Sequence, residues 1–124
     1  MSASILIVDD EVSILNSLSS ILEDEGYEVS VAKSGIEALK LCAVSPPELM
    51  MLDIWMPDMD GLETLRRLRE LVPQTQVMMM SGHGSIETAV KAIKLGAYDY
   101  IEKPLSLENV TLRVAGDAAA QADY

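Results

Sequence analysis

The sequence predicts an α/β fold in which five parallel strands form a doubly wound sheet with helices on both faces. Short apolar segments alternate five times with segments whose apolar residues recur at helical spacing. One apolar segment, residues 77–80, lacks alternating polar residues, as expected of a strand covered on both faces. The 124 residues fit one domain, residues 1–124, and are enough to bury a core.

The expected strands are the apolar segments at residues 4–8, 27–32, 49–53, 76–80 and 98–101. Each is followed by a helical pattern. Ser34 with Glu37 and Asp60 with Glu63 are typical of helix starts, and Gly26 is typical of a helix end. Helices of this kind turn an apolar stripe toward the core. The stripes of the five helices are, in order, Ile14, Leu15, Leu18, Ile21 and Leu22; Ile36, Leu39 and Ala43; Leu62, Leu65, Leu68 and Val72; Ile86, Ala89, Val90 and Ile93; and Leu107, Val110 and Val114.

Composition excludes several functions. A net charge of −11 argues against direct binding of nucleic acid, which requires Lys and Arg to replace phosphate counterions. The single cysteine, Cys42, cannot form an intrachain disulfide and is expected in the core. The amino-terminal residues do not resemble a signal peptide, and no segment approaches the ~20 apolar residues of a membrane span. We therefore expect a cytoplasmic protein without membrane contact.

The loops that follow four of the strands carry polar and charged residues. Open sheets of this kind bind ligands beyond the carboxyl ends of their strands. Those ends lead to residues 9–11 (DDE) after the first strand, Asp53 at the third, Ser81 after the fourth and Lys103 after the fifth. The sequence therefore predicts that carboxylates, a hydroxyl and an ammonium meet at one edge of the sheet.

Clustered carboxylates must either take up protons or bind a cation. An all-oxygen site favours Mg²⁺, with Mn²⁺ or Ca²⁺ as substitutes, over zinc. Taken singly, Asp9, Asp10 and Asp53 would be ordinary acids at helix starts or strand ends, and Ser81 and Lys103 ordinary loop residues. Their joint position at corresponding strand ends favours a site.

Four segments together resemble the receiver domain of two-component response regulators. They are residues 5–11 (ILIVDDE), 52–61 (LDIWMPDMDG), 80–84 (MSGHG) and 98–104 (YDYIEKP), in the order and spacing of that family. Residues 81–105 look most like receivers of nitrogen-regulation-type activators that depend on sigma-54. The resemblance implies a (βα)5 flavodoxin-like fold with strand order 2-1-3-4-5.

The resemblance also implies a role for each matching residue. Asp53 corresponds to the phosphoacceptor. Asp10 corresponds to a direct metal ligand, Asp9 to its neighbour acting largely through water, and the main-chain carbonyl of Trp55 to a further ligand. Lys103 corresponds to the cation that meets the phosphoryl oxygens.

Two further positions correspond to the conformational switch of the family. Ser81 matches the switching hydroxyl and Tyr100 the switching aromatic residue. The bond between Lys103 and Pro104 matches a cis peptide.

A receiver domain implies particular partners. A sensor histidine kinase would donate the phosphoryl group to Asp53, with Mg²⁺ as cofactor. The fourth helix, fifth strand and fifth helix would form the switched surface and a possible homodimer interface. An output domain in a longer chain would regulate transcription.

Three alternatives remain at this stage. An interaction module could keep this fold and never be phosphorylated. An aspartyl-phosphate phosphohydrolase generally needs a second acid two residues after its nucleophile, and that position is Trp55. A nucleotide- or flavin-binding protein would need a Gly-, Ser- or Thr-rich loop after the first strand, where this chain has residues 9–11 (DDE).

Overall fold

The computed structural model describes residues 3–82, 85–103 and 105–122. Its elements, in chain order, are β1 (Ser4–Val8), α1 (Val12–Asp24), β2 (Glu28–Ala32), α2 (Gly35–Val44), β3 (Leu49–Asp53), α3 (Gly61–Leu71), β4 (Gln76–Ser81), α4 (Ile86–Lys94), β5 (Asp99–Glu102) and α5 (Leu107–Ala122). Every strand lies within one residue of its predicted bounds. In the described residues, no helix has the length and apolar character needed to cross a lipid bilayer.

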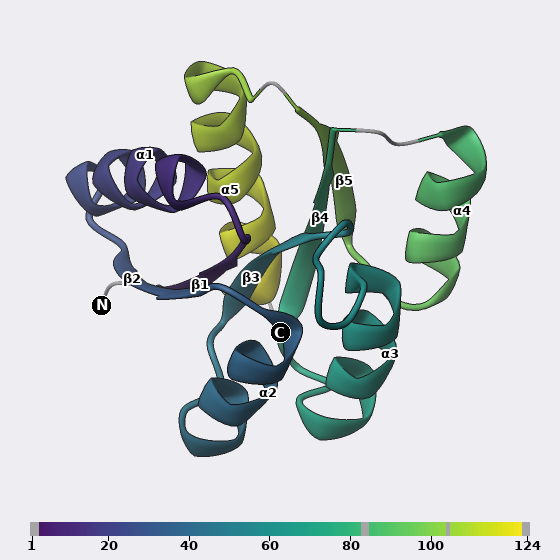
Figure 1. Ribbon diagram of the computed structural model, residues 1–124. Coiled ribbons are helices and arrows are strands. Elements are labelled where there is room, and N and C mark those ends of the chain that lie inside the picture. The colour runs from purple at the N-terminus through teal and green to yellow at the C-terminus, as the bar shows by residue number, and fades with distance from the viewer. Residues whose placement is uncertain (1–2, 83–84, 104, 123–124) are drawn as a thin grey trace.

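All five strands are parallel and their order is β2-β1-β3-β4-β5, which confirms the predicted fold and topology. Figure 1 shows α1 and α5 on one face of the sheet, with α2, α3 and α4 on the other. Because the chain reverses its direction of travel across the sheet after β2, the ends of β1 and β3 lie side by side. This is the place where ligands bind in open α/β sheets.

The two faces of the sheet bury separate apolar cores. Leu6, Met50 and Met79 belong to the core under α2, α3 and α4, whereas Ile7, Met51 and Met78 belong to the core under α1 and α5. Every residue of β3 is buried, as expected for a strand covered on both faces. The flexible methionine side chains fill space in both cores of a chain that has no phenylalanine.

The predicted helix ends are present. The Ser34 hydroxyl accepts a hydrogen bond from the Glu37 amide at 3.1 Å, and the Asp60 carboxylate accepts one from the Glu63 amide at 2.9 Å. Gly26, immediately beyond the end of α1, has φ = 94°, a conformation that costs glycine little and other residues more. These local features mark the starts of α2 and α3 and the end of α1.

Two of the predicted apolar stripes are wrong in their orientation. In α2 the buried residues are Gly35, Ala38 and Cys42, and Ile36 is half exposed. A Cβ atom at Gly35 would overlap Thr64 Oγ1 of α3, so small residues form the tightly packed face of α2 and the face with Ile36 turns outward. In α4 only Ala92 is buried, and the expected stripe of Ile86, Ala89, Val90 and Ile93 is exposed or partly exposed. The stripes of α1 and α3 do face the core, and Cys42 is buried as predicted.

Gly61 sets how closely α3 approaches the functional end of β3. Its amide donates a hydrogen bond to the Ile54 carbonyl at 2.6 Å. A Cβ atom at this position would overlap the Asp53 carbonyl oxygen and lie 2.6 Å from the Ile54 Cα atom. Backbone cannot move aside as a flexible side chain can, so only glycine fits here.

We expect Gly61→Ala to lower the free energy of unfolding by about 1–3 kcal/mol, because the added methyl group must displace the end of β3. The matched control is Gly116→Ala on α5, where an added Cβ meets no atom within 4 Å. This control should be about 0.5–1 kcal/mol more stable than the parent, because alanine favours helix. Urea unfolding measures both, and equal stability of Gly61→Ala and the parent would contradict the packing described.

Candidate functional site

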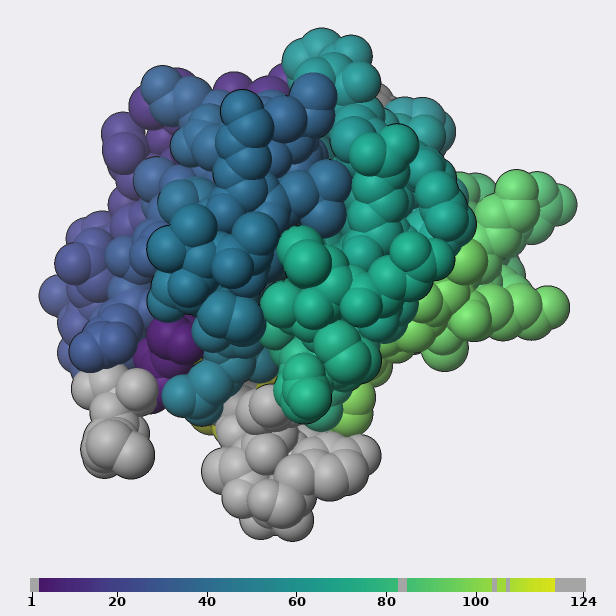
Figure 2. All heavy atoms as spheres, turned by 90° about the horizontal axis from the view of Figure 1, so that it is seen from below, coloured from purple at the N-terminus to yellow at the C-terminus, as the bar shows by residue number. Residues whose placement is uncertain are grey.

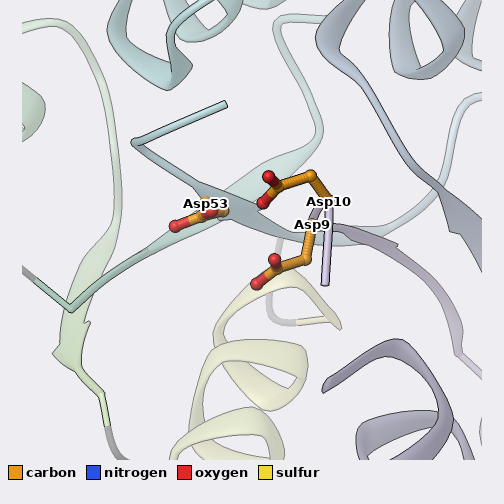
Figure 3. Close-up of side chains that lie close together, drawn as sticks. All are labelled: Asp9, Asp10 and Asp53. Atoms are coloured by element: carbon orange, nitrogen blue, oxygen red, sulfur yellow. The ribbon is translucent and has the colours of Figure 1, made fainter. Parts of the chain in front are cut away.

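Three aspartates from two neighbouring strands face the same small space. Asp9 and Asp10 follow β1, and Asp53 is the last residue of β3. One carboxylate oxygen from each lies within 4.8 Å of the other two. Figure 3 shows the three side chains close together, with the carboxylates of Asp9 and Asp10 directed toward the side on which Asp53 lies. Asp9 and Asp53 are buried and Asp10 is exposed, so the cluster is deep on one side and open to solvent on the other.

Lys103, which follows β5, brings a positive charge to these acids. Its Nζ atom lies 2.8 Å from Asp9 Oδ2, 3.5 Å from Asp53 Oδ1 and 3.6 Å from Glu11 Oε1. The Asp9 carboxylate also accepts the Glu11 amide through Oδ1 at 2.9 Å. The lysine side chain is only 12% exposed, so its charge acts on the acids with little screening by water.

The environment raises the pKa of Asp53 to about 6. Burial is the largest cause, the charge of Asp9 adds to it, and the Lys103 ammonium opposes it. Burial alone would lower the pKa of Lys103, but its hydrogen bond to Asp9 and the charges of Asp53, Asp9 and Glu11 outweigh burial, and that pKa is raised. The lysine therefore stays charged, while the Asp53 carboxyl is costly to ionise.

A surface hollow of about 200 Å³ opens onto the cluster and is lined by Asp10, Glu11, Asp53, Trp55, Gly82 and Lys103. All of its charged groups belong to the cluster just described. The hollow gives a small anionic group from solvent access to the Asp53 carboxylate beside the Lys103 ammonium.

Ser81 and Tyr100 lie on the strands next to this hollow. Ser81 is the last residue of β4 and is buried, and its Oγ accepts a hydrogen bond from Trp55 Nε1 at 3.2 Å. Tyr100, on β5, packs against the core under α2, α3 and α4. Its hydroxyl is buried and has no hydrogen-bond partner among the described residues.

The donor set suits a hard divalent cation. The cluster offers carboxylate oxygens, and the described residues bring no histidine or cysteine to it. A cation at the three aspartates would offset the repulsion that raises the pKa of Asp53. These residues could therefore hold a metal of the Mg²⁺ type.

The chain matches the family described as response regulator receiver domain over residues 5–115. It belongs to that family. This receiver domain is 47% identical over 114 residues to the nitrogen assimilation regulatory protein NtrX of Azorhizobium caulinodans, a match covering 90% of this chain and 25% of that protein. The receiver domain thus spans about a quarter of the length of such curated relatives.

Solved structures agree with this membership. A CheY-like response regulator receiver domain protein of Methanospirillum hungatei is 35% identical, with a TM-score of 0.95 over 99% of this chain and 98% of that chain. The NtrC4 receiver domain, solved in its beryllofluoride-activated form, is 44% identical, with a TM-score of 0.90 over 95% of this chain and 98% of that chain. Both cover nearly the whole of this receiver domain.

The structure brings Asp9, Asp10, Asp53, Trp55 and Lys103 together at the hollow, and Ser81 contacts Trp55 beside it. Tyr100 packs against the core and has no described contact with these residues. The structure also adds contacts that the sequence did not indicate. The bond between Lys103 and Pro104, predicted to be cis, involves a residue outside the described ones. The hydrogen bond from Trp55 to Ser81 joins the loop after β3 to the end of β4. Asp58 accepts the amides of Gly35 and Ile36, at 3.4 and 3.1 Å, and so ties the loop after β3 to the start of α2. In the sequence, the only indication of the contact between Trp55 and Ser81 was the indole N–H of Trp55, which needs a hydrogen-bond acceptor.

The raised pKa of Asp53 predicts a stability effect in the metal-free receiver domain. The folded state binds the proton more tightly than the unfolded state, whose pKa is 3.8. The resulting stability is fully present below pH 3.8 and is lost as the pH rises through about 6. We expect Asp53→Asn, which removes the charge, to be more stable than the parent at pH 7 by on the order of 1–3 kcal/mol.

The measurement is urea unfolding in the presence of EDTA at several pH values. The difference between Asp53→Asn and the parent should shrink as the pH approaches 4. A variant that is less stable than the parent at pH 7 would show that the attraction of Lys103 outweighs burial and Asp9.

Proposed function

We propose that the chain is the phosphoacceptor receiver domain of a two-component response regulator, and that Asp53 takes a phosphoryl group from a sensor histidine kinase. The observation that carries this proposal is the meeting of Asp9, Asp10, Asp53 and Lys103 at one edge of the sheet. Family membership supports the same function.

In the proposed reaction an oxygen of the Asp53 carboxylate attacks the phosphorus of a phosphohistidine. A new O–P bond forms a mixed anhydride, and the N–P bond of the donor breaks and releases its imidazole. With a pKa of about 6, Asp53 is largely ionised and nucleophilic at neutral pH. Lys103, 3.5 Å from Asp53 Oδ1, would neutralise charge on the transferred group.

Asp9, Asp10, Asp53 and the main-chain carbonyl of Trp55 are the proposed holders of Mg²⁺, for which Mn²⁺ or Ca²⁺ could substitute. When bound, the cation supplies positive charge to the phosphoryl oxygens. Asp10 is exposed and can exchange water for the metal, whereas Asp9 is buried against Lys103. This difference in burial supports the division into a direct ligand, Asp10, and a neighbour, Asp9.

Phosphorylation would be transmitted through Ser81 and Tyr100. The added group brings about −1.5 to −2 charges and strong acceptor oxygens, toward which the Ser81 hydroxyl would turn as a donor. Ser81 ends β4 beside β5, where it pairs with Glu102, so its movement reaches the strand that carries Tyr100. The surface formed by α4, β5 and α5 would exist in two conformations, and phosphorylation would shift the equilibrium between them.

The length of the relatives bears on the role of the longer protein. Because the chain spans about a quarter of their length, we propose that an output domain in a longer cytoplasmic protein regulates transcription. The receiver itself, with a net charge of −11, would not contact nucleic acid directly. Its own chemistry would be limited to self-catalysed phosphorylation and dephosphorylation.

Acetyl phosphate with Mg²⁺ should add one phosphoryl group to the protein, detected by intact mass. Asp53→Asn should abolish labelling because the nucleophile is gone, and EDTA should abolish it because the acids then lack their cation. The matched control is Asp24→Asn, an exposed acid at the end of α1, which should label like the parent.

Labelling of Asp53→Asn would refute the assignment of the phosphoacceptor. Absence of labelling in the parent, with acetyl phosphate and with sensor kinases, would favour an interaction module that is never phosphorylated. Multiple turnover on a phosphate monoester would instead favour a phosphohydrolase.

We further propose that phosphorylation promotes a homodimer through α4, β5 and α5. Ile86, Val90 and Ile93 of α4 and Tyr98 beside β5 are large, apolar and between 45% and 85% exposed. In Figure 2 the green segment that contains α4 stands out at one side of the molecule. The similar NtrC4 receiver domain is described as a dimer in its beryllofluoride-activated form. Lys91 and Lys94 of α4 could pair with Glu102 and Glu108 of a second copy.

Sedimentation should show more dimer when Mg²⁺ and beryllofluoride, a phosphoryl analogue, are added. Ile93→Asp should weaken the dimer at least about tenfold, because it places a charge in an apolar contact. Val44→Asp on α2, also highly exposed, is the control and should dimerise like the parent. Equal dimerisation by both variants would exclude this surface.

A further inference from the structure

Trp55 makes a contact that its proposed role as a main-chain ligand does not require. Its indole Nε1, in the loop after β3, donates a hydrogen bond to Ser81 Oγ at the end of β4 at 3.2 Å. The same side chain lines the hollow that opens onto Asp53 and Lys103. One residue therefore touches both the proposed switching hydroxyl and the space that a phosphoryl group would fill.

The two partners differ strongly in burial. Ser81 is 1% exposed, whereas Trp55 is 52% exposed even though it is the only tryptophan in the chain. A ring that is half in water is held by less packing than a fully buried one, and its N–H is free to seek a specific partner. The indole N–H can only donate, and its described partner is Ser81. The hydrogen bond is therefore the specific contact that orients the two side chains relative to each other.

From this contact we infer that Trp55 is a positioning residue that restrains the Ser81 hydroxyl in the unphosphorylated receiver. The inference rests on the proposed function, in which Ser81 turns toward a phosphoryl group on Asp53. A hydroxyl can accept from Trp55 and donate elsewhere at once, so the indole does not block the Ser81 proton. It restrains the position of the oxygen, and rotation of Ser81 toward Asp53 breaks or stretches the bond.

The restraint has a measurable consequence for switching. Any interaction present in only one of two states shifts the equilibrium between them by its own free energy. A neutral hydrogen bond contributes enough to change such an equilibrium about two- to tenfold. Removing the indole donor should therefore favour the state in which Ser81 contacts the phosphoryl group.

The first test is a titration of the chain with beryllofluoride in saturating Mg²⁺, followed by NMR. Trp55→Phe keeps an aromatic ring and removes the donor, and it should bind beryllofluoride about two- to tenfold more tightly than the parent. The matched background is Ser81→Ala, which has no hydroxyl to restrain. In that background the same Trp55→Phe change should leave the affinity unaltered.

The second test uses the indole N–H directly, because a single tryptophan gives a single indole resonance. In the parent this proton should be protected from exchange with solvent, and beryllofluoride should shift it and reduce its protection. In Ser81→Ala the resonance should already be shifted and unprotected before beryllofluoride is added. A tryptophan held only by packing would give the same protection in the parent and in Ser81→Ala.

Each other outcome overturns the inference. Equal affinities of Trp55→Phe and the parent would show that the bond does not restrain switching. An equal gain of affinity in both backgrounds would show that the ring acts by shielding the hollow. If the parent itself fails to bind beryllofluoride, the proposed function fails and the restraint fails with it. If the parent binds beryllofluoride normally but the variants do not behave as expected, only the inferred role of Trp55 is refuted.

Discussion

The site depends on one interaction, the approach of the Lys103 ammonium to the buried carboxylates of Asp9 and Asp53. Two carboxylates buried side by side repel each other, and a nearby cation offsets that repulsion. The lysine comes from the end of β5 and the acids from the ends of β1 and β3, so the contact exists only because the strands are parallel and ordered β2-β1-β3-β4-β5. The strand order therefore brings the charged groups of the site together, in addition to allowing the helices to pack on the sheet.

The sheet interior and its edge have opposite compositions. Apolar side chains, many of them methionine, fill both cores, whereas acids occupy the edge above them. The acids make the edge less stable, since burial and Asp9 hold the pKa of Asp53 at about 6. Buried groups that oppose folding in this way commonly mark functional sites. A cation at the three aspartates would relieve this repulsion, so stability and the proposed chemistry are coupled.

The helix nearest the proposed switch is also the most lightly packed. Among its described residues α4 buries only Ala92, whereas α3 buries Gly61, Thr64, Leu65 and Leu68. An element with few buried side chains can be displaced at low cost, which suits a surface that changes between two states. The hydrogen bond between Trp55 and Ser81 lies at the start of the segment leading to α4. A small rotation of Ser81 would therefore act close to α4, the helix with the fewest buried side chains.

The sequence by itself determined the strand positions, the helix caps at Ser34 and Asp60 and the meeting of Asp9, Asp10, Asp53 and Lys103, because each follows from local periodicity or from the rule that parallel strands end together. Tertiary structure alone decided which faces of α2 and α4 are buried. Small residues form the buried face of α2, and nothing described covers the outer face of α4. It also decided the contacts of Trp55 with Ser81 and of Asp58 with Ile36, which span 26 and 22 residues. Such pairs depend on the direction in which side chains outside the regular helices and strands point. That direction cannot be predicted from a hydrophobic pattern.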